Sequence, residues 1–199
     1  KRTSAIISMM LAGCLWGLAA APLFADSGEE KERLSLWIDL FRGEPLSYAE
    51  VLDDLATTDV VYLGEYHTVA RHHDMQFRIA ADLIKANKRL VLALEQLEAF
   101  QQSEVDRYNR GEIDFDGLVA AVDWPRRWGN YDQYRPAVEA ARRAGVPILA
   151  LNARAETIRK VARGGGIDRL DKETRSELPK DILLDDPAYR KRLTLQMMV

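Results

Sequence analysis

Hydrophobic and polar positions along the chain form two kinds of pattern. The first consists of three short, almost wholly apolar runs, at Val60–Leu63, Arg89–Leu94 and Val146–Leu151. Continuous apolar runs of this length are typical of strands that are covered on both faces, as in a parallel sheet. We therefore predict three parallel strands at these positions.

The second pattern is a spacing of three and four residues between apolar positions, which indicates amphipathic helices. Val69–Ala86 is the longest such segment. Ser47–Leu55 is another, and Ser47 followed three residues later by Glu50 has the form of a capping box at a helix N-terminus. Further helices are predicted at Leu34–Phe41, Glu98–Asn109, Phe115–Val122, Pro136–Gly145, Ala155–Arg163 and Asp186–Met198.

The order of these elements predicts an α/β fold in which a parallel sheet is flanked by helices. Several helical segments lie between the second and third strands, so we expect a helical insertion there. The chain reaches Val199 on an apolar stretch with no closing element. We therefore expect the domain to be incomplete at its C-terminal end.

Residues 1–25 have the pattern of a secretory signal peptide, because two basic residues precede the apolar run Ala5–Ala21. Two processing sites fit this segment. Cleavage after Ala25 would follow a small residue, whereas the Leu-Ala-Gly-Cys sequence ending at Cys14 resembles a bacterial lipobox with Cys14 as the acylated residue. In both cases we expect an exported bacterial protein, in the periplasm or anchored by lipid to the outer membrane or cell surface.

The rest of the chain, residues 26–199, has the composition of one globular domain, since the sequence is 47% hydrophobic and 30% charged. Cys14 is the only cysteine, so the domain has no disulfide and depends on its core. The net charge is −3, and residues 1–25 contain two basic and no acidic residues, so the domain alone carries −5. A nucleic-acid partner is therefore not expected.

Candidate chemistry follows the first predicted strand. Glu65 comes directly after Gly64, and all three histidines of the chain, His67, His72 and His73, lie close behind it. Ligands of open α/β sheets bind beyond the carboxyl ends of the strands. Because so many titratable groups gather at such a position, we expect the cluster to have a function.

Polar residues also follow the other two predicted strands. Glu95 ends the second strand and Asn152 the third, and parallel strands place both ends at the same edge of the sheet as Glu65. Carboxylates and imidazoles suit a divalent metal ion or general acid–base catalysis. We predict that the side chains of Glu65, His67 and Glu95 converge at this edge.

An aromatic and basic loop, Trp124–Tyr134, supplies a second candidate surface. Flat aromatic side chains beside cations suit a planar apolar ligand that carries carboxylates. Haem is such a ligand, and tyrosine is an axial ligand of haem iron in some proteins. The loop contains Trp124, Arg126, Arg127, Trp128, Tyr131 and Tyr134.

Four stretches, in this order, resemble the ChaN-type haem-binding lipoprotein family of bacteria: LGEYHTVARHHDMQ, ALEQLEAFQQ, DWPRRWGNYDQYRP and AGVPILALNAR. The resemblance implies an α/β domain, an export signal often of lipoprotein type, a role in haem or iron acquisition, and haem held at a dimer interface. The family is related more widely to erythromycin-esterase-like and TIKI-like proteins. In those proteins similar Gly-Glu-x-His and post-strand Glu positions serve hydrolysis, with a metal in some members.

Twelve positions match the family pattern, and Tyr66, Thr68 and Val69 depart from its usual small and polar residues. The matching positions are Gly64, Glu65, His67, His72, His73, Gln76, Glu95, Gln102, Trp128, Tyr134, Pro136 and Asn152.

The first hypothesis is an exported haem-binding protein that is not an enzyme and pairs as a homodimer. Tyr134 or Tyr131 would ligate the iron, and a histidine with Arg126 or Arg127 would pair with the propionates, because charge-assisted contacts hold carboxylates best. A membrane would be contacted only through a lipid on Cys14. The candidate cofactor-binding residues are Glu65, His67, His72, His73, Glu95, Arg127, Tyr131, Tyr134 and Asn152.

The second hypothesis is a metal-assisted hydrolase of esterase or peptidase type. Glu65, His67 and Glu95 would hold a divalent metal ion or activate water at the ends of the strands. The sequence contains neither a His-Glu-x-x-His helix nor a Gly-x-Ser-x-Gly elbow, so zinc-protease and serine-hydrolase sites of those types are not expected.

Overall fold

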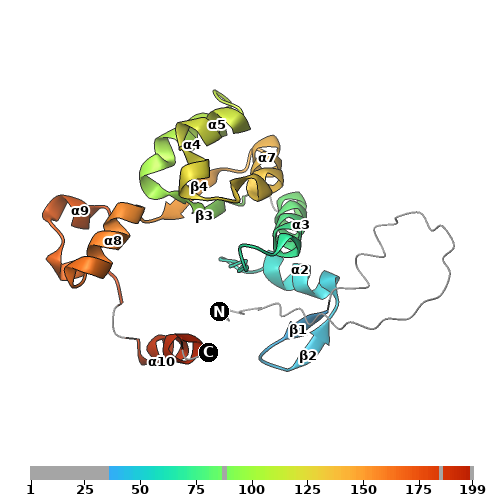
Figure 1. Cartoon of the computed structure of the whole chain (residues 1–199). Helices are drawn as coiled ribbons and strands as arrows, with labels where there is room; N and C mark the ends of the chain where they lie inside the picture. Colours follow the sequence, from blue (N-terminus) through green and yellow to red (C-terminus); the bar gives the residue numbers. More distant parts are fainter. Residues whose placement is uncertain (1–35, 87–88, 184–185, 198–199) are drawn as a thin grey trace, which may run out of the picture.

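The structure is a computed structural model, and it describes residues 36–86, 89–183 and 186–197 (Figure 1). The predicted signal peptide at residues 1–25 and Cys14 lie outside the described residues. Within the described ranges, no helix is long and apolar enough to cross a membrane.

The described chain begins with an antiparallel hairpin of β1 (Trp37–Asp39) and β2 (Glu44–Leu46). The predicted helix at Leu34–Phe41 is wrong over its described part. The Asp39 carboxylate accepts hydrogen bonds from the backbone N–H groups of Phe41 and Arg42 at 2.8 and 3.2 Å, and this forms a tight turn. Gly43 closes the turn at a φ of 72°, which a residue with a side chain rarely adopts.

Helix α2 (Tyr48–Ala56) begins at the predicted capping box, which is confirmed. The Ser47 hydroxyl accepts from the Glu50 N–H at 3.2 Å, and the Glu50 carboxylate accepts from the Ser47 N–H at 2.8 Å. Helix α3 (Ala70–Ala86) covers the buried side of α2. Their shared core contains Trp37, Tyr48, Val51, Leu55, Ile79 and Leu83.

A two-stranded parallel sheet, β3 (Leu92–Glu98) and β4 (Ile148–Asn152), lies in the middle of the molecule (Figure 1). Leu92 is opposite Ile148, and Glu98 is opposite Asn152, with an irregularity between Leu94 and Glu98. The α/β fold class, with a parallel sheet flanked by helices and a helical insertion between its strands, is confirmed. The second strand begins and ends later than Arg89–Leu94, the range that the sequence predicts.

The helical insertion between β3 and β4 contains η1 (Ala99–Gln101), α4 (Gln102–Asn109), α5 (Phe115–Ala121), α6 (Trp124–Arg127), η2 (Tyr131–Tyr134) and α7 (Arg135–Arg143). The segment predicted as an aromatic loop therefore holds the two short helices α6 and η2. The main core lies between the insertion and one face of the sheet, and Leu97, Tyr108, Trp124 and Ile148 are among its fully buried side chains.

Side-chain amides complete the hydrogen bonding of β4. Asn109 donates to the Ile148 carbonyl and accepts from the Ile148 N–H, both at 3.0 Å. Gln102 accepts from the Ala150 N–H at 2.8 Å. These two residues of α4 take the place that a further strand would occupy along β4. On the other face of the sheet, the side chains of Leu149 and Leu151 are exposed.

The predicted strand at Val60–Leu63 is wrong, because this segment joins no sheet in the described part of the chain. Val61 and Leu63 pack against the core of α2 and α3, while Val60 is exposed. The Leu63 carbonyl accepts a hydrogen bond from the Gln76 side chain at 2.9 Å. The segment is therefore held by helix α3 rather than by a neighbouring strand.

After β4 the chain forms α8 (Ala155–Gly164), η3 (Ile167–Arg169), α9 (Lys172–Ser176) and α10 (Pro187–Met197). Helices α8 and α9 extend away from the sheet on the side opposite α3 (Figure 1). Gly165 and Gly166 have positive φ values of 87° and 112°, so glycine is needed where α8 ends.

Candidate functional site

The candidate site is built around the buried carboxylate of Glu65, whose side chain is 5% exposed. Its Oε1 lies 2.7 Å from Nδ1 of His67 and also accepts a hydrogen bond from the Tyr134 hydroxyl. Its Oε2 lies 3.0 Å from Nδ1 of His73. One carboxylate thus joins the loop before α3, the first turn of α3 and the short helix η2.

His73 is the buried member of the histidine cluster, with a side chain that is 4% exposed. Its Nε2 lies 3.0 Å from the His67 carbonyl, which can only accept, so Nε2 donates. Its ring meets the Tyr134 ring edge to face at 5.0 Å between centroids. His73 therefore connects α3, the loop and η2 from the inside.

His67 is the most exposed member of the cluster, with a side chain that is 53% exposed. Its ring lies edge to face with that of Trp128, at 4.9 Å between centroids. Its backbone carbonyl accepts from the Asn130 side chain at 2.7 Å and from His73 at 3.0 Å. Asn130, which the sequence analysis missed, thus fixes the loop from the insertion side.

His72 and Gln76 fix the same loop from α3. Nδ1 of His72 accepts from the Tyr66 N–H at 2.9 Å, and the Gln76 amide donates to the Leu63 carbonyl. A loop carbonyl and a loop N–H are thereby satisfied by side chains in place of strand partners. The first two turns of α3 consequently hold the chain on both sides of Glu65.

The charges of the site follow from these contacts. Burial alone would raise the pKa of Glu65, but hydrogen bonds from Tyr134 and His67 and the charges of His73 and His67 hold it below its usual value. Burial raises the pKa of Tyr134 well above that of free tyrosine, and its hydrogen bond to the Glu65 carboxylate raises it further. The site therefore pairs a charged carboxylate with a neutral phenol.

Glu95 does not join this cluster. It is exposed on β3, and within the described residues it forms no hydrogen bond or ion pair with Glu65 or His67. The convergence of Glu65, His67 and Glu95 that the sequence predicts is therefore absent. The neighbours of Glu65 are instead His67, His73 and Tyr134.

The carboxylate at the end of β3 is Glu98, a residue that the sequence analysis missed. Both of its oxygens lie 2.8 Å from Nη1 of Arg127, and the Ala155 N–H donates to Oε2 at 3.3 Å. Asn152 is opposite Glu98 in the register, so the two strand ends do meet. The sequence signal for Glu98 was the position at which the second strand ends. Extending the predicted strand past Leu94 to Glu98 would have placed Glu98 beside Asn152.

The aromatic segment divides between core and surface. Trp124 is buried, and its Nε1 donates to the Gln96 carbonyl at 2.9 Å. Tyr131 packs on Trp124, with 6.0 Å between ring centroids. The side chain of Arg126 is 84% exposed and lies 3.8 Å from the Asp123 carboxylate. Of the two arginines predicted to face propionates, Arg127 is already engaged by Glu98 and Arg126 is more accessible.

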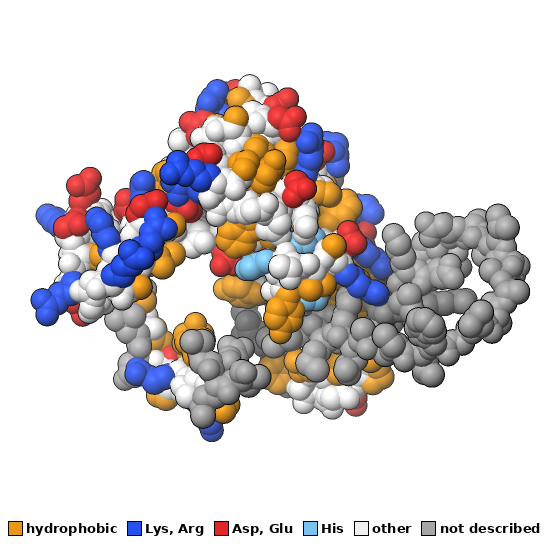
Figure 2. Space-filling model, viewed as in Figure 1, with side chains coloured by type: hydrophobic (Ala, Val, Ile, Leu, Met, Phe, Trp, Pro, Cys, Tyr) orange, Lys and Arg blue, Asp and Glu red, His pale blue; other side chains and the backbone are white. Residues whose placement is uncertain are grey.

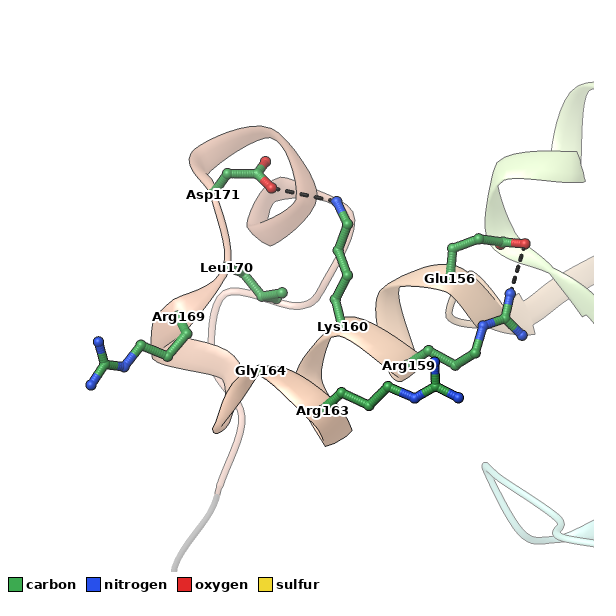
Figure 3. Close-up of a pocket in the computed structure, with 8 residues that line it drawn as sticks. All are labelled: Glu156, Arg159, Lys160, Arg163, Gly164, Arg169, Leu170 and Asp171. Atoms are coloured by element: carbon green, nitrogen blue, oxygen red, sulfur yellow. Dashed lines mark hydrogen bonds and ion pairs between the residues drawn. The ribbon is translucent and has the colours of Figure 1, made fainter.

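A second concave surface lies between α8 and η3, with a volume of about 530 Å³ (Figure 3). Lys160 reaches across it to Asp171 at 3.5 Å, and Arg159 pairs with Glu156 at 3.1 Å. None of the predicted site residues lines this cavity. It is lined by Glu156, Arg159, Lys160, Arg163, Gly164, Arg169, Leu170 and Asp171.

The donor groups do not form a metal cage. Among the described residues, no group of three or more His, Cys, Asp or Glu side chains is arranged to hold a metal ion. Glu65 is already surrounded by Tyr134, His67 and His73. The His67 imidazole is the most exposed of the three, His72 is partly exposed and His73 is buried.

The fold and the site define an α/β protein whose polar centre lies between a loop and the helical insertion of its sheet. Residues 51–199 match the profile of the family described as haem-binding uptake, Tiki superfamily, ChaN, and the chain belongs to this family. The resemblance that the sequence motifs carry is thereby confirmed. No curated protein matches the sequence.

A solved structure, described as cofacial heme binding to ChaN of Campylobacter jejuni, is similar in fold, with a TM-score of 0.60 at 20% sequence identity. The similarity covers 81% of this chain and 60% of that one. The chain thus spans about 60% of the length of this relative.

Proposed function

We propose that the protein binds haem at the surface around His67 and acts in bacterial haem or iron acquisition after export. The family to which it belongs and the chemistry of the donor set both support this. The observation that carries the proposal is the half-exposed imidazole of His67, which a buried carboxylate holds at one nitrogen and the Trp128 ring contacts edge to face.

The donor set fits haem better than it fits a catalytic divalent metal ion. Porphyrin supplies four nitrogen ligands, so the protein needs to add only one or two. A catalytic zinc site needs about three protein ligands and an open position. The exposed His67 imidazole meets the first requirement, whereas no group of three or more His, Cys, Asp or Glu side chains among the described residues meets the second. The metal-assisted hydrolase therefore receives less support from the geometry.

Apolar side chains lie exposed in the same loop as His67. They suit the flat face of a porphyrin, since binding sites for planar ligands are mostly apolar with a few polar groups. Figure 2 shows histidine side chains reaching the surface among hydrophobic ones. The exposed apolar residues of the loop are Val60, Tyr62, Tyr66 and Val69.

Tyr134 has a different part in this proposal from the iron ligation that the sequence suggested. Its hydroxyl is buried against Glu65, and a phenolate there would face a carboxylate. We therefore assign Tyr134 to holding Glu65 in place. Arg126 is the better placed of the two arginines to meet a propionate, because it is exposed and Arg127 is not free.

Export, anchoring and assembly complete the proposal. The pattern of residues 1–25 supports export, and Cys14 would carry a lipid anchor if the lipobox is used. Haem shared between two copies of the chain is what the family resemblance implies. Bound haem would supply an iron centre for transport, while the protein's own residues position it and limit its contact with water.

Titration of haemin into the purified full-length protein tests the proposal. We expect the Soret band to shift and to saturate at micromolar haemin. Metal analysis of the same preparation, with an ester- or peptide-cleavage assay, tests the hydrolase. An unchanged Soret band at micromolar haemin would refute haem binding. Stoichiometric zinc or manganese, with cleavage activity lost in Glu65→Ala, would favour the hydrolase instead.

A further inference from the structure

The cavity between α8 and η3 is formed by a sharp change of chain direction. Gly165 and Gly166 have positive φ values of 87° and 112°, and this lets η3 fold back beside the last turn of α8. The cavity has a volume of about 530 Å³, which is usual for a small-molecule site. None of the residues that line it belongs to the cluster around Glu65.

Basic side chains dominate the lining of this cavity. Four of its eight residues are arginine or lysine, and two are acidic. Arg163 and Arg169 are exposed, and among the described residues their guanidinium groups form no hydrogen bond or ion pair. Arg163 lies beside Arg159, while Arg169 extends outward from the opposite side (Figure 3). Because no contact in the described chain holds Arg169 in that direction, its side chain is free to turn towards a ligand.

Glu156 is one of the two acidic residues of the cavity, and it has a partner on each side. Its carboxylate lies 3.1 Å from Arg159 within the cavity and 3.7 Å from Arg127 outside it. When Arg159 turns towards an anion, Glu156 therefore keeps a cation. Sharing Arg159 with a ligand does not leave this carboxylate without a counter-charge.

Asp171, the other acidic residue, is held mainly by the helix that it caps. It accepts two hydrogen bonds at 2.8 Å, from the N–H and the hydroxyl of Thr174. Lys160 lies 3.5 Å from Asp171 and donates to the Thr174 hydroxyl at 2.9 Å. An ammonium group has three N–H donors, so these two contacts leave one donor of Lys160 for a ligand.

The positions of the cations favour a phosphate group over a carboxylate. They belong to two elements and lie on opposite sides of the cavity (Figure 3). A phosphate group carries oxygen acceptors that point in several directions, whereas the two oxygens of a carboxylate lie in one plane. Guanidinium groups bind phosphate oxygens in pairs. Leu170 is partly exposed in the same cavity and offers an apolar contact to the remainder of a phosphate ester.

The charge of the chain is divided in a way that favours anion binding here. Residues 153–199 contain eleven basic and eight acidic residues, so their net charge is +3, whereas residues 26–152 carry −8. An anion is therefore attracted to the part of the chain that forms the cavity and repelled by the rest.

We propose that the cavity between α8 and η3 binds a phosphate-bearing anion through Arg159, Lys160, Arg163 and Arg169. The site is separate from the proposed haem-binding surface around His67. Soluble phosphate compounds and the head groups of anionic phospholipids present the same chemistry to these cations, so the two sources are distinguished by separate probes.

Two probes test the site on the full-length protein: calorimetric titration with inorganic pyrophosphate, and cosedimentation with phosphatidylcholine vesicles that contain phosphatidylglycerol. In the double variant Arg163→Gln/Arg169→Gln we expect binding to weaken about tenfold or more, because two charge-assisted contacts are lost. The matched control is Arg110→Gln/Arg143→Gln, which removes two exposed arginines outside the cavity and changes the net charge equally. It should change the affinity less than about twofold at about 0.15 M salt, where distant charges are screened.

The outcomes separate the two sources from each other and from a simple effect of charge. Pyrophosphate binding that the double variant loses supports a site for soluble phosphate compounds, and the same loss with vesicles alone supports a lipid head group. No loss in the double variant, or an equal loss in the control, would overturn the site. Wild-type protein that binds neither probe would also overturn it.

A single substitution covers the case in which the double variant does not fold. Arg169→Gln removes an exposed side chain that has no partner among the described residues, so the fold should not depend on it. Binding of the probe should still weaken several-fold in this variant. Unchanged binding in a folded Arg169→Gln protein would overturn the assignment.

Discussion

Glu65 is the residue whose contacts determine the structure of the site. It is a buried carboxylate with three partners: His67 and the Tyr134 hydroxyl contact its Oε1, and Nδ1 of His73 lies 3.0 Å from its Oε2. Removing one partner lowers the free energy of unfolding, because the buried charged group then loses a contact and does not become hydrated in its place.

Tyr134→Phe tests this at the level of one hydroxyl. The substitution removes the hydroxyl that donates a buried hydrogen bond to Glu65 and leaves the ring in place. We expect the free energy of unfolding to fall by about 2 kcal/mol, the usual loss for a hydrogen bond to a charged group. Urea unfolding of the ligand-free protein measures it.

Tyr131→Phe is the matched control, because Tyr131 packs on Trp124 and its hydroxyl forms no hydrogen bond to the described residues. We expect a change within about 0.5 kcal/mol. If the two phenylalanine variants were equally stable, the Tyr134 hydroxyl would not be supporting Glu65.

The sequence predicts part of this site, for a physical reason. Glu65, His67 and His73 are close in the chain, so a turn and the start of a helix are enough to bring them together. Tyr134 lies 69 positions after Glu65, and Asn130 lies 63 positions after His67. No local pattern specifies which side chains of their segment will face Glu65. Their place depends on how the insertion packs on α3.

At the scale of elements, patterns that depend on neighbouring residues were predicted best. The capping box of α2 and the helical spacing of α3 involve contacts within one or two turns. The Val60–Leu63 strand was wrong because an apolar run does not reveal whether a strand or a helix will lie beside it. The β1–β2 hairpin was missed because the short segment around Trp37 has a spacing that also fits a helix.

Helix α9 allows a prediction of pH dependence. Asp171 caps this helix and accepts hydrogen bonds from the Thr174 N–H and hydroxyl, both at 2.8 Å. These bonds lower the pKa of Asp171 from 3.8 to about 2. Because the folded-state pKa is lowered, the cap stabilises α9 fully above pH 3.8 and is lost as the pH falls towards 2.

A carboxyl NMR titration of Asp171, with amide exchange at Thr174, checks this. We expect the carboxyl group to titrate near pH 2 and Thr174 to lose protection over the same range. Titration at 3.8, with Thr174 unprotected throughout, would show that the cap does not form in solution.

At the scale of the whole molecule, the contact between Glu98 and Arg127 joins three parts. Glu98 ends β3, Arg127 ends α6, and the Ala155 N–H at the start of α8 donates to the same carboxylate. Arg127 and Arg154 also lie over the Phe100 ring, at 5.0 and 3.8 Å from its centroid. This group links the sheet to the helices that extend away from it.

Arg127→Ala should therefore affect more than its own surroundings. Glu98 would stay buried without its cation, and we expect a loss of about 2 kcal/mol, less than for a fully buried pair because the Arg127 side chain is 28% exposed. Limited proteolysis should cut faster near α8. Arg126→Ala, at an exposed position in the same helix, is the control. Equal stability and equal cleavage in the two variants would contradict the linking role.

The overall fold class could be predicted because alternating strand and helix patterns leave few arrangements. Over the part of the chain that the structure describes, the sheet is smaller than predicted, with two parallel strands where three were expected. Gln102 and Asn109 satisfy the backbone of β4 in place of a further strand. Whether side chains take the place of a strand depends on where α4 packs. The spacing of apolar residues along the chain therefore does not predict it.

The long separation between Glu65 and Tyr134 has a consequence for the order in which the molecule assembles. The β1–β2 hairpin and the pairing of α2 with α3 close over short stretches of chain, whereas Tyr134 reaches Glu65 across 69 positions. Closing a longer loop costs more entropy, and contacts between distant residues slow folding. During refolding we therefore expect helical structure to return first, and the ability to bind a ligand at His67 to return last.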